Sequence, residues 1–537
     1  MKPRYSITRT LFVLVVVFSV CFGAYAQVTV TTHRNDNSRT GQNLQETALN
    51  TSNVNSASFG KLFTRSVDGE IYAQPLYVSN LKIKNKTRNV VYVATEGNNV
   101  YAFDADDPTA AAALWQVNLG TPVPDTDVAS YCIDIQPQVG VTGTPVIDTS
   151  SDTMYVVAKS KNTADNTYKF QIHALDLVTG AEKFGGPTDI YGRVPGTGDG
   201  SHDGYLYFYA LHHNNRPGLL LLNGTVYVAF GATCDVRPWH GWIFGFDAST
   251  LKQNTIYSTT PNGYSAGIWG GGEGLLADSS NIYVMTGNGS FDVNNANGTD
   301  YGDSVVKLNT TGGLKAVDYF TPFDQAFYND IDLDLGSGGP IALPGTGLIV
   351  AMGKDAHLRL IDSNDMGQYH DGYNADLQEF LPTTSPQFAP FMGAPIYWNS
   401  PGWGPVIYMW GSGDYVKAFQ FTNGQFNEFP VSQSTTAGII GYSNAVPLSL
   451  SANGNQAGTG IVWSAGPYSG DANQKIVHGI VRAFDATNLG NELWNSRQNA
   501  TRDDVGTYAK FCPPTIANGK VYVATFSNRL VVYGLLP

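Results

Sequence analysis

Residues 91–115 read VYVATEGNNVYAFDADDPTAAAALW, and this stretch decides the fold. It contains a β-rich strand with a central tyrosine (91–95), a second strand that ends in Asp104, and an aromatic edge at Leu114-Trp115. Together with the strand start Gln74-Pro75-Leu76 it forms a unit of about four short strands. A unit of this size is what one blade of a β-propeller requires.

The same order of strand start, tyrosine strand, aspartate-ended strand and aromatic edge recurs along the chain. The later units begin at Thr144, Leu219, Gly274, Gly339, Ala394, Ala445 and Pro514. The repeat predicts an all-β, eight-bladed propeller with four antiparallel strands in each blade. Seven blades is the alternative count, because the fourth and sixth units lack the terminal aspartate.

The two ends of the chain predict how the ring closes. The last unit stops before its edge strand, while an edge-like segment, Gly60-Lys61-Leu62-Phe63, stands alone before the first unit. We expect this segment to complete the last blade, since the pairing removes the exposed edges of an open array. The predicted organisation is a signal peptide (1–26), an N-terminal extension (27–59) and a single propeller domain (60–537).

The first residues indicate export. Lys2, Arg4 and Arg9 precede an apolar run, 11–22, and Ala24-Tyr25-Ala26 follows it as a small-residue cleavage site. We therefore expect a secreted protein, periplasmic or extracellular, without a transmembrane segment, because no later run approaches twenty apolar residues. Removal of residues 1–26 takes away three positive charges and changes the net charge from −13 to −16. Such an acidic surface argues against nucleic acid or an anionic membrane as partner.

Three cysteines remain in the mature chain: Cys132, Cys234 and Cys512. In an oxidising compartment two of them can form a disulfide and one thiol is left over, but the sequence leaves the pairing open. No Cys-x-x-Cys-His motif is present, which excludes a covalently attached c-type haem.

The eight units resemble the repeat of the pyrroloquinoline quinone (PQQ) dehydrogenases, whose consensus is close to Val-Tyr-Val-x-Thr, Leu-Tyr-Ala-Leu-Asp-Ala and Leu-Trp. The resemblance covers nearly the whole mature chain and implies the propeller fold. The same repeat also occurs in non-catalytic propellers such as outer-membrane assembly scaffolds, so it does not imply activity by itself.

More specific motifs lie between residues 220 and 365. The strand 282–288, IYVMTGN, resembles the family's Thr-Gly-Asn strand, whose asparagine binds calcium, and this implies that Asn288 is a metal ligand. The run 329–334, NDIDLD, resembles the family's Trp-Asp-Tyr-Asp segment and aligns Asp332 with the catalytic base.

Two further residues follow from the same resemblance. Gly353-Lys354-Asp355 resembles the family's Pro-Lys-Asn-Gly segment, whose lysine reaches the quinone. Upstream, the family places a calcium-binding glutamate in a loop that here spans 231–240, and Asp235 is the nearest acid.

These residue types suit the implied chemistry. Calcium prefers six to eight oxygen ligands, which Asp235, Asn288, Asp332 and oxygens of the cofactor could supply. The resemblance implies an oxidoreductase in which Asp332 takes the hydroxyl proton of an alcohol or sugar and hydride passes to PQQ. Lys354 would stabilise the charge that develops on the cofactor.

The sequence also departs from the family. The adjacent cysteine pair is missing, because Ile133 follows Cys132, and the glutamate that precedes the first-blade strand is replaced near Tyr72. The tryptophan on which the quinone stacks falls at or beside Glu273, while Trp269 lies four residues earlier. Trp269 and Glu273 are therefore the two candidates for that cofactor-binding position.

Other interpretations of these motifs remain open. Asp330, Asp332 and Asp334 could form a solvated turn, and 286–289 could be an Asn-Gly hairpin turn. Two further polar groups also lie in loops: His212, His213, Arg216, Arg237, Trp239 and His240, and His33 to Asp36 with Arg39. Residues of the first group could line a ligand-binding mouth of the propeller.

The alternative function is a non-catalytic propeller that binds a protein or a glycan, and a third is another extracellular enzyme on the same scaffold. Convergence of Asp235 or Glu273 with Asn288, Asp332 and Lys354 on the central axis, within reach of a single metal ion, distinguishes the oxidoreductase from the scaffold; scattered positions would contradict the dehydrogenase.

Overall fold

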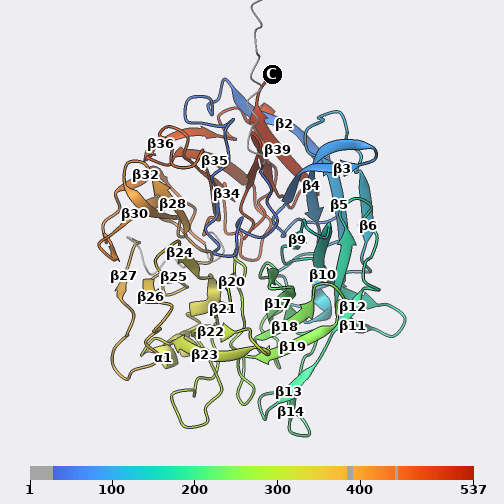
Figure 1. Ribbon diagram of the computed structural model, residues 1–537, viewed down its shortest axis with the longest axis vertical. Helices are drawn as coiled ribbons and strands as arrows, with labels where there is room; N and C mark the ends of the chain where they lie inside the picture. Colours follow the sequence, from blue (N-terminus) through green and yellow to red (C-terminus); the bar gives the residue numbers. More distant parts are fainter. Residues whose placement is uncertain (1–27, 384–390, 442–444) are drawn as a thin grey trace, which may run out of the picture.

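The computed structural model describes residues 28–383, 391–441 and 445–537, so the predicted signal peptide lies outside the described residues. The chain forms eight antiparallel sheets around a central channel (Figure 1). This confirms the predicted eight-bladed β-propeller. Within the described ranges, no helix is long and apolar enough to cross a membrane.

We number the blades in chain order from their first strands. The first four blades comprise β3 (Leu76–Ile83), β4 (Lys86–Ala94), β5 (Asn99–Asp104) and β6 (Trp115–Asn118); β9 (Val146–Asp148), β10 (Thr153–Asn162), β11 (Thr167–Asp176) and β12 (Thr188–Ile190); β16 (Leu220–Leu222), β17 (Thr225–Ala232), β18 (Trp242–Asp247) and β19 (Gln253–Ser258); and β20 (Leu276–Ala277), β21 (Asn281–Met285), β22 (Val305–Asn309) and β23 (Lys315–Phe320).

The last four blades comprise β24 (Ile341–Leu343), β25 (Leu348–Met352), β26 (Leu358–Asp362) and β27 (Gln378–Phe380); β28 (Ile396–Ser400), β29 (Gly404–Met409), β30 (Tyr415–Thr422) and β32 (Ser432–Ala437); β33 (Leu448–Ser451), β34 (Ile461–Pro467), β35 (Gly479–Asp485) and β36 (Asn488–Asn495); and β37 (Thr515–Ala517), β38 (Lys520–Val523), β39 (Arg529–Leu535) and β2 (Phe59–Ser66).

Short elements decorate the ring. They are β1 (Gln42–Asn43), β7 (Val123–Pro124), β8 (Gln138–Val139), β13 (Arg193–Pro195), β14 (Tyr205–Tyr207), β15 (His213–Asn214), β31 (Gln425–Phe426), the helices α1 (Gln325–Ile331) and α2 (Ala500–Asp503), and the 3₁₀ turns η1 (Asp125–Asp127) and η2 (Leu335–Ser337).

The ring closes through strand β2, as the sequence predicts. This strand contains the edge segment 60–63 and pairs antiparallel with β39 at the end of the chain, with Lys61 opposite Tyr533. The N-terminal strand thus becomes the outer strand of blade 8, and no open edge remains between the first and last blades.

The repeated tyrosine joins neighbouring blades. The hydroxyl of Tyr92 in blade 1 donates to the carbonyl of Leu177 in blade 2, and that of Tyr155 in blade 2 donates to Ala248 in blade 3. The same bond joins blade 6 to blade 7 and blade 8 to blade 1, through Tyr408 and Tyr522. In each case the acceptor is the residue after the aspartate that ends the third strand, which explains why tyrosine and aspartate recur together.

The change Tyr92→Phe should isolate the contribution of one such bond. It removes one of the two donors to the buried Leu177 carbonyl, which keeps the indole N–H of Trp115, so we expect the free energy of unfolding to fall by about 0.5–1.5 kcal/mol. Equilibrium urea unfolding measures the loss. Tyr101→Phe in the same blade is the matched control. The hydroxyl of Tyr101 accepts a hydrogen bond from the backbone N–H of Asp68 in an exposed loop, so its removal should lower the free energy of unfolding by less.

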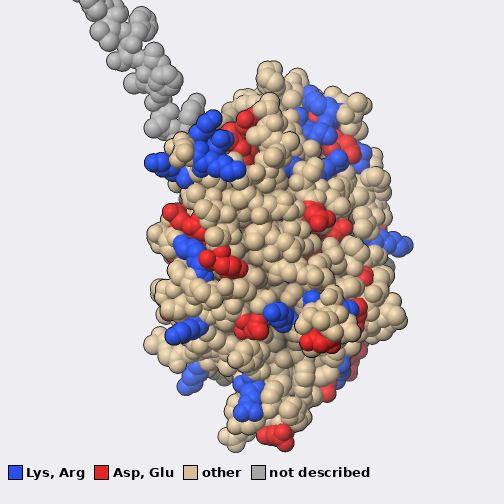
Figure 2. Space-filling model, turned by 90° about the vertical axis from the view of Figure 1, so that its right-hand side faces the viewer, with Lys and Arg blue, Asp and Glu red and all other residues tan. Residues whose placement is uncertain are grey.

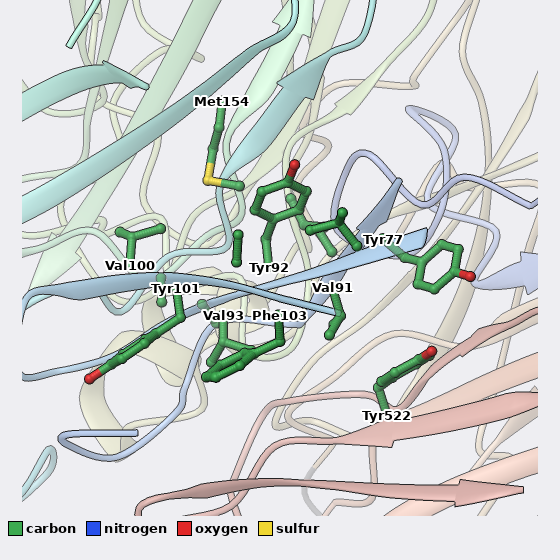
Figure 3. Packing of buried hydrophobic residues seen from close by; sticks show 14 of the residues in the cluster. Tyr77, Val91, Tyr92, Val93, Val100, Tyr101, Phe103, Met154 and Tyr522 are labelled. Carbon is green, nitrogen blue, oxygen red and sulfur yellow. The ribbon is translucent and has the colours of Figure 1, made fainter. Parts of the chain in front are cut away.

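Apolar side chains fill the space between the blades. Figure 3 shows part of the cluster that joins blades 8, 1 and 2, in which Tyr77 packs on Tyr522 with ring centroids 5.6 Å apart. Met154 of blade 2 and Tyr92 of blade 1 belong to the same cluster. Burial of these large side chains supplies the main stabilisation of the blade interfaces.

The N-terminal extension forms a second ring inside the first. The first strand of every blade lines the channel, and residues 30–43 hydrogen-bond to all eight of these strands or their flanks in blade order (Figure 1, dark blue). The eight partners are Tyr77, Ile147, Leu221, Ala277, Ala342, Tyr397, Leu450 and Ile516. Gly41 is required here, because its φ is +67° and a Cβ would lie 2.4 Å from Ile396.

Two arginines of this inner segment are completely enclosed. Arg34 pairs with the buried carboxylate of Glu273 at 3.0 Å, and Arg39 donates from Nε to the carbonyl of Leu275 and from Nη1 to that of His33. The polar group at residues 33–39 is therefore part of the core. It closes the channel beneath the loops that carry the candidate site.

Candidate functional site

A cavity of about 290 Å³ lies at one mouth of the central channel. Most of its walls come from loops that enter the first strands of the blades, which gather at this mouth because the first strands line the channel. The charged wall residues are Asp134, Arg216, Asp235, Asp332, Asp334, Lys354 and Lys510, and the aromatic ones are Tyr72, Trp269 and Phe511.

The centre of the site is a network around Asp332. The ammonium group of Lys354 donates to Oδ1 of Asp332 at 2.9 Å and to Oδ2 of Asp334 at 2.6 Å. The side-chain amide of Asn288 donates to the same Oδ1 of Asp332 at 2.8 Å. Three residues that the sequence assigned to one site, Asn288, Asp332 and Lys354, are thus in direct contact.

Backbone geometry places these groups. Asp332 ends helix α1 in the left-handed conformation, with φ of 62°, and its side chain is 68% exposed at the cavity. Asp334 is buried below it and accepts from the backbone N–H of Asn288 at 2.8 Å. Gly287 permits this approach, because a Cβ there would lie 2.2 Å from Asp334 Oδ1.

Charge balance keeps Lys354 protonated. Burial alone would lower the pKa of Lys354, but Asp334 and Asp332 outweigh it and raise the pKa above its ordinary value. Behind the network, burial raises the pKa of Asp303 well above its ordinary value. A neutral Asp303 receives the backbone N–H of Leu335 and supports the loop that carries Asp334.

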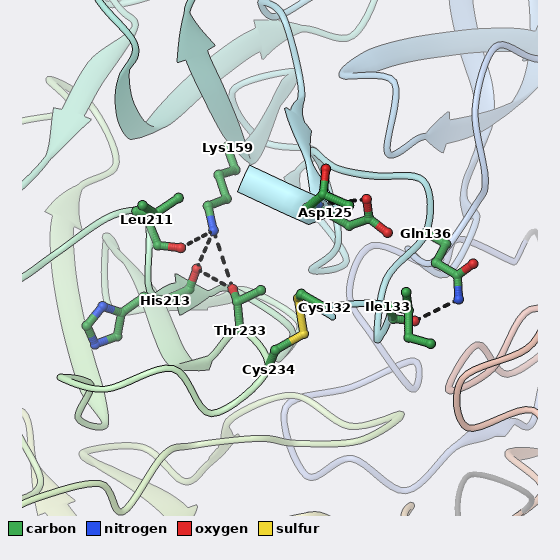
Figure 4. The surroundings of a disulfide bond; sticks show 10 residues. Asp125, Cys132, Ile133, Gln136, Lys159, Leu211, His213, Thr233 and Cys234 are labelled. Carbon is green, nitrogen blue, oxygen red and sulfur yellow. Dashed lines mark hydrogen bonds between the residues drawn. A yellow bond between two sulfur atoms is a disulfide. The ribbon is translucent and has the colours of Figure 1, made fainter. Parts of the chain in front are cut away.

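The disulfide joins Cys132 to Cys234 and leaves Cys512 as a buried free thiol (Figure 4). It connects the loop before β8 to the loop after β17, and each cysteine lies within two residues of a carboxylate in the cavity wall, Asp134 or Asp235. Desolvation, together with the negative charges of Asp334 and Asp134, raises the pKa of Asp235 to about 7. The residue is nevertheless partly exposed to solvent.

Replacement of both bridged cysteines by serine should destabilise the protein and loosen this wall. The bridge spans 102 residues, so we expect a loss of about 2–4 kcal/mol in the free energy of unfolding. Urea unfolding measures it. Dithiothreitol should lower the stability of the unmodified protein and leave that of the double variant unchanged; an equal effect on both would contradict a role for this bridge.

Trp269 forms an aromatic wall of the cavity. Its ring packs against Gly231 and Gly267, and its indole N–H is buried without a hydrogen-bond partner in the described chain. The guanidinium group of Arg216 lies 5.3 Å from the Trp269 ring and 4.8 Å from that of Phe511. Trp269, rather than Glu273, therefore faces the cavity among the two candidates for the stacking position.

Glu273 is turned away from the cavity. Its carboxylate is fully buried against Arg34, and burial raises its pKa although Arg34 and Arg39 oppose the shift. The structure thus brings together Asp235, Trp269, Asn288, Asp332 and Lys354, and places Glu273 in the inner core.

A second cavity of about 320 Å³ adjoins the first, and both are lined by Asp235, Asp332 and Asp334. Its other walls are Arg237, Trp239, Tyr264, Ser265, Asn288 and Asn329. Arg237 lies 4.4 Å from the Tyr264 ring, and the amide of Asn329 donates to the Tyr264 hydroxyl. This chamber offers several hydrogen-bonding groups beside Asp332.

The predicted metal ligands have the right donor atoms, although they do not form a closed carboxylate cage. Among the residues that the structure describes, no three His, Cys, Asp or Glu side chains group closely enough to hold a metal ion. The side-chain oxygen of Asn288 is buried and has no hydrogen-bond partner in this part of the chain. An unsatisfied amide oxygen beside Asp332 is suited to a hard cation or to a hydroxyl donor.

The histidines of the loop cluster are mainly structural. His213 and His240 are buried and bond to backbone carbonyls, and burial lowers the pKa of His213 to about 3. Arg216 and Arg237 line the two cavities, as the cluster suggested. Sequence reasoning missed Lys510, Phe511 and Asp134, because no motif marks the loops in which they lie.

No protein-family profile and no curated protein sequence matches this chain. Among solved structures, the quinohemoprotein alcohol dehydrogenase ADHIIG from Pseudomonas putida HK5 is similar with a TM-score of 0.54 and 13% identity, over 94% of this chain and 80% of that one. The quinohemoprotein alcohol dehydrogenase from Comamonas testosteroni gives a TM-score of 0.54 and 14% identity, over 96% of this chain and 81% of that one. At these identities the likeness concerns the fold.

Proposed function

We propose that the protein is a quinoprotein-like oxidoreductase that oxidises an alcohol or sugar hydroxyl. The observation that carries this proposal is the convergence of Asp235, Trp269, Asn288, Asp332 and Lys354 on adjoining cavities at the channel mouth. These residues belong to blades 3, 4 and 5 and to the loops between them. The fold therefore brings them together although they are far apart in the sequence.

The first cavity suits a flat, anionic cofactor of the PQQ type. Arg216 and Lys510 supply two cations for carboxylate groups, Lys354 balances the charge of Asp332 and Asp334, and Trp269 supplies an aromatic surface and an unpartnered N–H donor. The unpartnered Asn288 oxygen, with Asp332 and Asp235, would hold calcium. The quinone, when bound, would accept hydride from the substrate carbon.

Asp332 is the residue that would take the hydroxyl proton. Its Oδ1 receives two hydrogen bonds, from Lys354 and Asn288, and these fix the carboxylate in one orientation. Its Oδ2 makes no hydrogen bond with the described residues and is free to accept a proton. The second cavity, with Arg237, Ser265 and Asn329, would orient a hydroxyl-bearing substrate toward that oxygen.

Export also belongs to this proposal. The disulfide between Cys132 and Cys234 is typical of oxidising compartments, which supports a periplasmic or extracellular location.

The experiment that tests the proposal is a titration of the mature protein with PQQ, with and without calcium, followed by absorbance and calorimetry. We expect saturable binding that requires calcium and that Asn288→Ala and Asp332→Ala abolish. Asp330→Ala, an exposed neighbour outside both cavities, is the matched control and should bind as the unmodified protein does. Absence of binding at high micromolar cofactor would refute the oxidoreductase and favour a scaffold for a protein or glycan.

Binding of an anionic cofactor should weaken as the pH rises. Burial lowers the pKa of Lys510 to about 8, so this lysine is cationic at pH 7 and largely neutral at pH 9. We expect the dissociation constant of PQQ to increase by about tenfold over that range, the loss of one modest charge-assisted bond. Lys510→Gln should bind weakly throughout and show a flatter pH profile.

A further inference from the structure

Helix α1 presents an apolar face to solvent. Phe327 and Ile331 lie four residues apart on α1 and are 55% and 50% exposed, while Tyr328 of the same helix is buried. Phe323, which is 42% exposed, lies two residues before the helix. Tyr373 is 55% exposed, and the neighbouring Asn374 accepts the backbone N–H of Phe323. We call these four residues (Phe323, Phe327, Ile331 and Tyr373) the α1 patch. Helix α1 lies in the connection between blades 4 and 5, beside the outer strand β23 (Figure 1).

Exposed apolar side chains are concentrated in this part of the chain. Of seventeen large apolar side chains that are exposed in the described chain, six lie between residues 323 and 381. Exposed apolar side chains that are grouped, unlike single ones, mark interaction surfaces.

The chain segment that carries the α1 patch is rich in acidic residues, and the one lysine of blade 4 that bonds to it, Lys307, donates to the backbone carbonyl of Ser363 and not to a carboxylate. Residues 321–383 contain ten acidic residues and two basic ones. Both basic residues are engaged inside, Lys354 with Asp332 and Asp334, and Arg359 fully buried with Asp355. Asp330, Asp365 and Asp371 are exposed. On the side of the ring shown in Figure 2, by contrast, acidic and basic side chains are interspersed.

We infer that the α1 patch is the docking site of a basic protein, which contacts it through an apolar centre ringed by lysine or arginine. Charge complementarity selects this partner, because the uncompensated carboxylates attract a cationic surface. The same carboxylates repel anionic lipid headgroups, so the exposed aromatics are not a membrane anchor.

The position of the patch connects docking with the candidate site. Asn329 lies on α1 and lines the second cavity, and Asp332 follows the helix directly and lines both. A protein seated on the α1 patch therefore lies beside the cavity mouth. This inference does not depend on the bound cofactor or on turnover.

The test uses two synthetic amphipathic helical peptides, one with leucine on one face and lysine on the other, and one with glutamate in place of lysine. We expect the mature protein to bind the lysine peptide in a fluorescence anisotropy titration and to ignore the glutamate peptide. The double variant Phe327→Ser/Ile331→Ser should weaken binding by about tenfold or more. The variant Asp365→Asn/Asp371→Asn should weaken it less and reduce its dependence on salt.

The control is Phe429→Ser, which removes a 79% exposed phenylalanine from blade 6, beside Glu428. It should bind the lysine peptide as the unmodified protein does. Equal loss in this variant, equal binding of the two peptides, or affinity that is unchanged in Phe327→Ser/Ile331→Ser would each overturn the inference. Thermal unfolding of every variant verifies that it is folded, which these exposed positions allow.

Discussion

The change Arg34→Met should lower the free energy of unfolding by about 3–5 kcal/mol. The side chains of Arg34 and Glu273 are both completely buried and lie 3.0 Å apart, so removal of the guanidinium breaks the ion pair and leaves Arg39 as the remaining positive charge near the buried carboxylate. It also removes donors to the carbonyls of Ala394 and Pro395 in blade 6. Urea unfolding followed by tryptophan fluorescence measures the effect.

Two further variants separate the charge from the packing. Glu273→Gln on the Arg34→Met background removes the charge of the buried carboxylate, and we expect it to recover part of the lost stability. Lys520→Met breaks an ion pair with Asp106 at the surface and should cost less than about 1 kcal/mol. If Arg34→Met lowered the free energy of unfolding by no more than Lys520→Met does, the buried ion pair of the inner segment would not be important for the stability of the propeller.

The sequence predicts the ring because the signal is local and repeated. Most units carry a tyrosine strand, an aspartate turn or both, so a unit that lacks one of these marks, as the fourth and sixth lack the aspartate, does not disturb the count of the others. Closure by 60–63 was predictable for the same reason, since a lone edge strand must find a partner. Asn288, Asp332 and Lys354 were predicted from the resemblance of three short motifs to those of the PQQ dehydrogenases, and the propeller fold brings these three residues into contact.

The inner segment could not be predicted in this way. Residues 30–43 bind the blades mainly through backbone groups, which leave no pattern of side-chain types along the chain. Gly41 and the two buried arginines are its only clear sequence marks, and an arginine is ordinarily a surface residue. Glu273 shows the same difficulty, because counting along a loop does not tell which residue faces the cavity and which faces the core.

Pairs distant in sequence escape prediction for a related reason. Cys132 and Cys234 are 102 residues apart, and three cysteines permit three pairings. Lys510 and Arg216 reach the cavity from different blades, and single basic residues in loops carry no motif. Only the closed ring brings Arg216 and Lys510 to the same cavity.

The last prediction concerns Asp332. On an alcohol or sugar that the holoprotein oxidises, Asp332→Asn should lower kcat by about 100-fold to 10,000-fold, since an amide cannot accept the hydroxyl proton. The amide keeps an oxygen for Lys354 and closely matches the carboxylate in size, so the network and the fold should persist. Turnover with an artificial electron acceptor, measured over a range of pH, is the readout.

The control is Asp330→Asn, two residues earlier on α1, exposed and absent from both cavities. It should retain the kcat and the pH profile of the unmodified protein. A calcium titration of Asp332→Asn distinguishes loss of the proton acceptor from loss of the metal, because only the second weakens calcium binding in proportion to activity. If Asp332→Asn kept kcat within a few-fold of the unmodified protein while cofactor and calcium still bound, proton transfer would have to be assigned to another carboxylate of the shared wall. Asp235 would be the first to test, because it lines both cavities.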